Sequence, residues 1–191
     1  MPVPEFYFDL ACPFSYLAAE QVERTLGEVE WIPVAGSAPA SVWLDDAELR
    51  ARAEREARRL RLPLTWPDCS TPAFVSAARV AAYAAESGVG GAFALAALRF
   101  AFSGGYDLED PEILGEAAAA AGLNPSRCLA VARGGDADHA HEDVERHLAE
   151  HGIGVLPAVL MGERWFAGDQ AVAQAGAYRR AVTTPDLTPT A

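Results

Sequence analysis

The sequence of 191 residues contains no lysine, so its 15 basic residues are all arginines, and they face 27 aspartates and glutamates. The formal net charge of −12 disfavours binding to nucleic acid, because affinity for a phosphate backbone depends on neutralising its charge. The same charge disfavours an anionic membrane surface. An anionic small ligand therefore requires a local arginine or a helix N-terminus to hold it.

Cysteine is also scarce, and the three cysteines, Cys12, Cys69 and Cys128, form no CxxC pair. An odd number of scattered cysteines argues against a disulfide framework and favours a reducing compartment. No apolar run is long and uninterrupted enough to predict a membrane span. Strand-like residues begin at Glu5, without the pattern of an export signal before them. We therefore predict a cytoplasmic protein that binds neither membrane nor nucleic acid.

The chain begins with a pattern typical of an α/β protein. Residues 5–10 are aromatic and favour a strand, residues 13–27 have helical spacing, and residues 28–35 favour a second strand. Because a helix joins the two strands, we expect them to be parallel with a right-handed crossover. Pro33 cannot donate a hydrogen bond to a neighbouring strand and favours an edge position or a bend.

A long helical stretch follows, and the α/β pattern then returns. A charged helix is predicted over residues 45–61, and later helices are predicted to begin where a capping residue precedes proline: Thr71-Pro72, Asp110-Pro111 and Asn124-Pro125. The segments after Gly152 predict a hairpin and a last helix, at residues 156–161, 164–167 and 170–182. The predicted organisation is a discontinuous α/β domain, residues 1–40 and 153–191, with an inserted helical domain, residues 41–152.

Cys12 occupies the capping position of the first predicted helix, directly before Pro13. A neutral thiol is a poor cap, but a thiolate there would meet unpaired backbone N–H groups and the positive end of the helix dipole. Free cysteine has a pKa of about 8.5, and a fall of about two units would make the thiolate the main form at neutral pH. The carboxylate of Asp9 opposes this fall or accepts the proton through water. We expect a reactive Cys12 rather than a small buried apolar residue.

The motif order resembles a known fold. A strand, Cys-Pro-x-x and a helix, followed much later by GVLP and a hairpin, resemble the thioredoxin fold, and the inserted helices resemble its DsbA branch. Intracellular members, the kappa-class glutathione transferases and 2-hydroxychromene-2-carboxylate isomerases, carry FYFDxxSPYSYL where this chain has FYFDLACPFSYL. The chain is also similar to them in LPLTWPDCSTPAFVSAARVAAYA, DPEILGEAAAAAGL and HGIGVLPAVLMGERWFAGDQ. The resemblance covers nearly the whole chain and implies an α/β, thioredoxin-like fold with an all-helical insertion.

The resemblance also implies roles for individual residues. Cys12 falls on the attacking cysteine of the disulfide oxidoreductases and on a serine of the transferases and isomerases, and Ser15 falls on the oxidoreductases' second cysteine. Pro157 falls on the family's cis-proline, whose preceding backbone pairs with a bound thiol peptide. The loop from Gly168 to Gln170 falls where the transferases hold the γ-glutamyl end of glutathione, but it departs from their G-S/Q-D-R pattern. The residues implied in thiol binding are Pro13, Phe14, Leu156, Gly168, Asp169 and Gln170.

Three functions remain open. With Ser15 in place of a second cysteine, Cys12 would act alone, as a thiol–disulfide oxidoreductase or thiol transferase. Alternatively, Cys12 replaces the serine that hydrogen-bonds the glutathione thiolate in a glutathione-dependent isomerase or transferase. The third function is a binding module without catalysis. The expected partners are a small thiol and a disulfide or a small electrophile, and the relatives imply a homodimer. Glutathione or another low-molecular-weight thiol is the expected cosubstrate, without a permanently bound cofactor or metal.

Other polar residues admit simpler explanations. Cys69 is either a distant resolving thiol or a partly buried structural cysteine, and Cys128 is expected in the core. His147 and His151 share a helical face, which suits a metal, but a solvated amphipathic helix explains them as well. Arg61 and Arg79 are candidates for holding an anion, although surface ion pairing accounts for each of them.

Overall fold

The computed structural model of the chain describes residues 2–35, 46–69, 73–135 and 138–183. Its four-stranded sheet has the order β2-β1-β3-β4, formed by β1 (Glu5–Phe8), β2 (Glu30–Pro33), β3 (Ala158–Met161) and β4 (Arg164–Ala167). Strands β1 and β2 are parallel, and β3 is antiparallel to both β1 and β4. The predictions of a parallel pair, of an edge position for Pro33 and of a C-terminal hairpin are confirmed.

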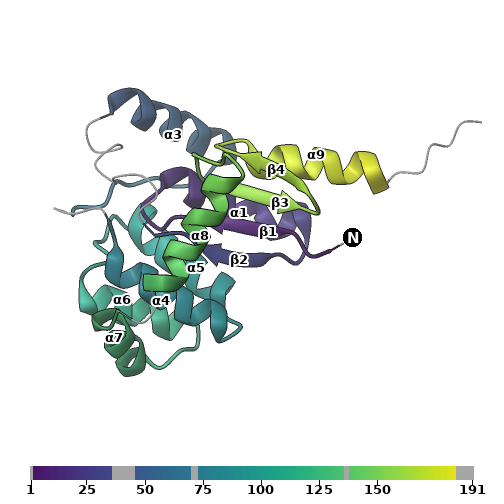
Figure 1. The fold of residues 1–191 in the computed structure, drawn as a ribbon. Coiled ribbons are helices and arrows are strands. Elements are labelled where there is room, and N and C mark those ends of the chain that lie inside the picture. The colour runs from purple at the N-terminus through teal and green to yellow at the C-terminus, as the bar shows by residue number, and fades with distance from the viewer. Residues whose placement is uncertain (1, 36–45, 70–72, 136–137, 184–191) are drawn as a thin grey trace, which may run out of the picture.

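Helices enclose the sheet and continue beyond one edge of it (Figure 1). α1 (Pro13–Leu26) packs beside α9 (Ala171–Thr183), and α9 contacts β3 and β4. Between β2 and β3 the described chain forms only helices: α3 (Ala47–Leu60), α4 (Val75–Glu86), α5 (Gly90–Phe102), α6 (Pro111–Ala120), α7 (Pro125–Arg133) and α8 (Asp138–Glu150). None of the helices in the described part of the chain is long and apolar enough to cross a membrane. The predicted α/β fold with a helical insertion is confirmed, while the domain boundaries stay a prediction.

Side-chain caps are seen at the starts of α3, α6 and α7, whereas α1, α4 and α5 have none. Asp46, Asp110 and Asn124 each accept a backbone N–H from the first turn of the helix that follows. The predicted start at Thr71-Pro72 lies outside the described residues, and the described helix α4 begins at Val75. The buried Phe74 precedes this helix with φ of 39°, and the Ser76 N–H donates to the Glu109 carboxylate at 2.8 Å. A cap supplied from 33 residues away leaves no local signal.

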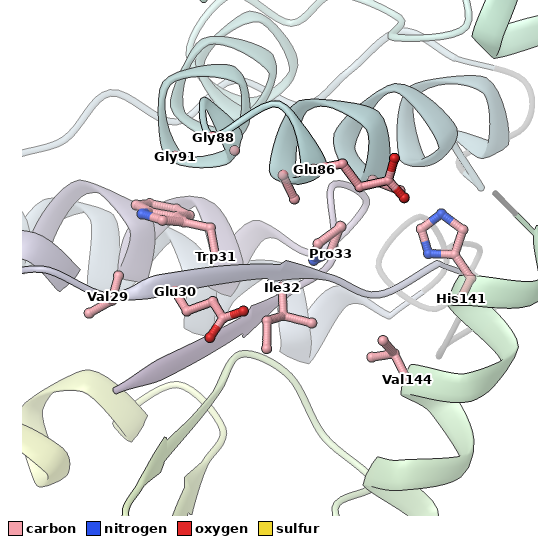
Figure 2. A pocket seen from close by; sticks show the side chains of 13 residues that line it. Val29, Glu30, Trp31, Ile32, Pro33, Glu86, Gly88, Gly91, His141 and Val144 are labelled. Atoms are coloured by element: carbon pink, nitrogen blue, oxygen red, sulfur yellow. The ribbon is translucent and has the colours of Figure 1, made fainter. Parts of the chain in front are cut away.

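Gly91 lets the inserted helices approach the sheet (Figure 2). A Cβ added at Gly91 would lie 2.5 Å from Trp31 Nε1. The indole is also held by a hydrogen bond, because Trp31 Nε1 donates to Glu23 of α1 at 3.2 Å. Trp31 is buried and contacts both Phe6 and Phe8 edge-on. The position therefore admits no side chain without moving an aromatic core residue.

We expect Gly91→Ala to lower the free energy of unfolding by about 1–3 kcal/mol, because it overpacks the contact with Trp31. Gly115→Ala is the matched control, since Gly115 is also helical. A Cβ added at Gly115 would lie 3.8 Å from Pro125 Cβ, which is an ordinary contact. That substitution should raise stability by about 0.5–1 kcal/mol, because alanine restricts the unfolded chain. Urea denaturation measures both, and equal effects at the two positions would contradict the prediction.

Candidate active site

Cys12 lies in the turn that joins β1 to α1. Its N–H donates to the Asp9 carbonyl at 3.1 Å, and its own carbonyl accepts the Ser15 N–H at 3.0 Å. The residue has an extended backbone and precedes Pro13 at the first helical position, as predicted. Its side chain makes no capping hydrogen bond to α1. Instead, the thiol donates to the Leu156 carbonyl with Sγ and O 3.6 Å apart.

Leu156 and Pro157 bring the second half of the site to this thiol. The Leu156–Pro157 bond is cis, which the resemblance implied. The Pro157 carbonyl accepts the Gly168 N–H at 2.8 Å, so the loop that follows β4 is tied to the same segment. Residues separated by 144 positions in sequence thus meet at the Cys12 sulfur. The resemblance implied that Cys12 lies beside Leu156 and Pro157, and the structure shows this contact, while their roles in thiol binding stay a prediction.

Ser15 and Asp9 lie beneath Cys12 and are both buried. The Asp9 N–H donates to Ser15 Oγ at 3.1 Å, and the Asp9 carboxylate accepts the Ala11 N–H at 2.7 Å. The hydroxyl of Ser15 and the amide N–H groups of Ser15 and Phe14 favour negative charge on the Cys12 sulfur. The site therefore contains donors for a thiolate and a carboxyl group close behind it.

The ionisation of Cys12 is opposite to the sequence prediction. Burial, with a smaller contribution from the negative charge of Asp9, raises the pKa of the Cys12 thiol to about 11. The hydrogen bonds from Ser15 and Phe14 lower this pKa but do not outweigh burial. The expected thiolate at neutral pH is therefore wrong for the resting site. Cys12 rests as a neutral thiol, consistent with its donation to Leu156.

Asp9 is a carboxyl group whose pKa lies near neutral pH. Burial, with a smaller contribution from the charge of Glu145, raises its pKa to about 7, although the hydrogen bond from the Ala11 N–H acts in the opposite direction. A carboxyl with such a pKa is divided between its charged and neutral forms at neutral pH. Asp9 can therefore take up a proton under physiological conditions, which an ordinary aspartate does poorly.

Two further predicted residues, Phe14 and Asp169, contact an arginine that the sequence analysis missed. Arg52 of α3 places its guanidinium carbon 4.8 Å from the centre of the buried Phe14 ring. Its Nε lies 3.2 Å from the Asp169 carboxylate, in a partly exposed ion pair. Gln170 and Asp169 line a cavity of about 230 Å³ between α1, α3 and α9. α3 carries many charges, and no sequence pattern distinguishes Arg52 from its neighbours.

The other candidates from the sequence lie in different settings. Arg79 donates to the Ala132 carbonyl at 3.1 Å, and Arg61 ends α3 in a left-handed conformation. Cys128 is fully buried, as predicted. Cys69 is partly buried, and burial, with Asp107 and Asp68, raises its pKa to about 11. A resolving role for Cys69 stays a prediction.

Neither the histidines nor the residues that line a second cavity are among the predicted residues of the Cys12 site. In the described ranges, no three His, Cys, Asp or Glu side chains are grouped to hold a metal ion. His147 and His151 pack against Trp165. A cavity of about 510 Å³ runs along the edge strand β2, between α8 and the turn from α4 to α5 (Figure 2). It is lined by Trp31, Pro33, Glu86 and His141 among others, and by none of the predicted site residues.

The fold and the Cys-Pro motif beside a cis-proline define a thioredoxin-fold protein with a helical insertion. Residues 5–178 match the DSBA-like thioredoxin domain, and the chain belongs to that family. A search of curated protein sequences finds no match.

Solved structures agree on the fold. A 2-hydroxychromene-2-carboxylate isomerase superposes with a TM-score of 0.79 at 14% identity, covering 99% of this chain and 100% of its own. A probable DsbA oxidoreductase from Streptomyces coelicolor gives 0.75 at 20% identity, with coverages of 98% and 92%. The cytosolic disulfide reductase DsbM from Pseudomonas aeruginosa, solved with glutathione, gives 0.69 at 16% identity, with coverages of 95% and 98%. At these identities the likeness shows the fold.

Proposed function

We propose that this protein is a thiol-dependent oxidoreductase in which Cys12 alone exchanges with small disulfides. The observation that carries the proposal is the position of the Cys12 sulfur, 3.6 Å from the Leu156 carbonyl and beside the cis-proline. The hydroxyl and N–H of Ser15 and the N–H of Phe14 favour a thiolate when one forms. Pro13 sets the start of the helix below the sulfur.

The reaction begins with removal of the thiol proton. Asp9, whose pKa is raised to about 7, accepts this proton in its ionised form. Once Asp9 is protonated, its charge no longer opposes the Cys12 thiolate. The thiolate then attacks one sulfur of the small disulfide, so that a new S–S bond forms as the old one breaks. The leaving thiolate takes up a proton and departs.

The resulting mixed disulfide must be resolved by a second small thiol, because Ser15 stands where a local resolving cysteine would be. That thiol attacks the mixed disulfide, restores the Cys12 thiolate and leaves as part of a new disulfide. Glutathione is one candidate cosubstrate, since the disulfide reductase DsbM was solved with it. The departure of Gly168, Asp169 and Gln170 from the transferase pattern leaves other low-molecular-weight thiols open.

A second function is favoured by the neutral state of Cys12. A thiol with a pKa of about 11 donates a hydrogen bond, as the serine of the isomerases and transferases does. In a glutathione-dependent isomerase or transferase, Cys12 would donate to the thiolate of the bound cosubstrate. The structural likeness to a 2-hydroxychromene-2-carboxylate isomerase supports keeping this candidate.

Intact-mass measurement of the protein after incubation with small symmetric disulfides tests the two functions. Exchange at Cys12 predicts a single adduct that dithiothreitol removes and that Cys12→Ser abolishes. Cys69→Ser is the matched control and should keep the adduct. The isomerase or transferase function predicts instead that Cys12→Ser retains turnover of an electrophilic substrate with added thiol. A wild-type protein without any adduct would contradict exchange.

A further inference from the structure

Arg52 is held in a fixed position next to the Cys-Pro-Phe-Ser motif. Its guanidinium lies over the Phe14 ring, two residues after Cys12, while its Nε pairs with Asp169. Stacking on an aromatic face and pairing at one edge fix the plane of a guanidinium. The arginine side chain is still 53% exposed, so this cation is accessible from solvent.

The ion pair changes what Asp169 can recognise. A free carboxylate in this loop would attract an ammonium group, such as the α-amino group of a γ-glutamyl thiol. Here the Arg52 guanidinium, with its Nε 3.2 Å from Asp169 Oδ2, already offsets the negative charge of Asp169 and so weakens its attraction for an ammonium group. The guanidinium carries five N–H donors, and the ion pair engages Nε, which leaves the terminal nitrogens available for a second anion.

Because the surroundings of Cys12 are negatively charged, an anionic substrate needs a nearby cation to bind there. The chain carries a net charge of −12, the negative charge of Asp9 acts on the Cys12 thiol, and that of Glu145 acts on Asp9. This field repels an approaching carboxylate or sulfonate. Arg52 is the arginine that the described residues place against both Phe14 and Asp169.

We infer that Arg52 selects thiols and disulfides bearing a carboxylate or sulfonate for exchange at Cys12, an inference that rests on the proposed function. The terminal nitrogens of the guanidinium bind the anion, Phe14 keeps the guanidinium in plane, and Asp169 competes with the substrate for it. The substrate class is therefore a small anionic thiol rather than one recognised through its ammonium group.

Three symmetric disulfides of similar length test the inference: dithiodipropionate, bis(2-hydroxyethyl) disulfide and cystamine, which are anionic, neutral and cationic. Rates of adduct formation at Cys12 are measured by intact mass at low ionic strength. Arg52→Gln should lower the dithiodipropionate rate relative to the neutral disulfide by about fivefold, the effect of one exposed ion pair. Asp169→Asn should raise that ratio, because it frees Arg52.

Arg50→Gln is the matched control, since Arg50 lies on the same helix and stacks on Trp66 with its guanidinium 4.5 Å from the ring centre. It removes the same charge and should leave the ratio unchanged. An equal fall in Arg50→Gln, or an unchanged ratio in Arg52→Gln, overturns the inference while exchange itself stands. Absence of an adduct with all three disulfides overturns the proposed function and this inference together.

Discussion

Alkylation of Cys12 by iodoacetamide is expected to be slow at neutral pH and to accelerate up to pH about 11, the raised pKa of the thiol. Only the thiolate reacts, so the rate should rise about tenfold for each pH unit below the pKa. Relative to a thiol with the ordinary pKa of 9.0, the two-unit rise predicts alkylation about 100-fold slower at pH 7. Peptide mass mapping at each pH measures the rate at this cysteine alone.

Cys69 provides an internal comparison, because burial also raises its pKa to about 11 through a different set of neighbours, Asp107 and Asp68. Urea-unfolded protein gives the rate of each cysteine without its environment. A rate at Cys12 that reached its plateau below pH 8 would mean a resting thiolate, and would restore the helix dipole as the main influence. A plateau above pH 10 would confirm the dominance of burial.

The order of elements was readable from local patterns, whereas the ionisation of the site was not. Strand-helix-strand periodicity, Pro33 and the Cys12-Pro13 pair predicted the first strands and helix because each acts on its own neighbours in sequence, whereas the complete fold was implied by the family resemblance. The Cys12 pKa depends on how deeply the thiol is buried and on Asp9 behind it, and both are products of the packed fold. Cys12 does lie at the N-terminus of α1, but the expected lowering of its pKa by the helix is outweighed by burial.

The arginine that we propose to bind the substrate anion, Arg52, could likewise not be identified from the sequence. The sequence contains 15 arginines, and the sequence analysis named Arg61 and Arg79 as the candidates for holding an anion. Only the packing of α3 against Phe14 and the loop after β4 singles out Arg52. The capping of α4 by Glu109 was hidden for the same reason, since its partners are remote in sequence.

Asp9→Asn should stabilise the protein at pH 8 and leave its stability nearly unchanged at pH 4. An unfolded aspartate titrates near 3.9, and burial raises the folded pKa of Asp9 to about 7. Below pH 4 the carboxyl is largely neutral in both the folded and the unfolded protein, so it does not lower the free energy of unfolding. As the pH rises to 7, the unfolded chain releases a proton that the folded protein retains, and stability falls. The full cost above pH 7 is on the order of 4 kcal/mol.

Asparagine stays neutral at every pH and keeps a side-chain oxygen that can accept the Ala11 N–H, so Asp9→Asn removes the charge while this hydrogen bond is kept. Urea denaturation at pH 4 and pH 8 measures the gain, with Asp143→Asn on the exposed face of α8 as a control for net charge. The same variant should shift the alkylation of Cys12 to lower pH, because the Asp9 charge raises that pKa. An equal gain at both pH values would contradict the raised pKa. Asp9 would then be ionised throughout this range, and it could not take up the proton of Cys12 near neutral pH as the proposed exchange requires.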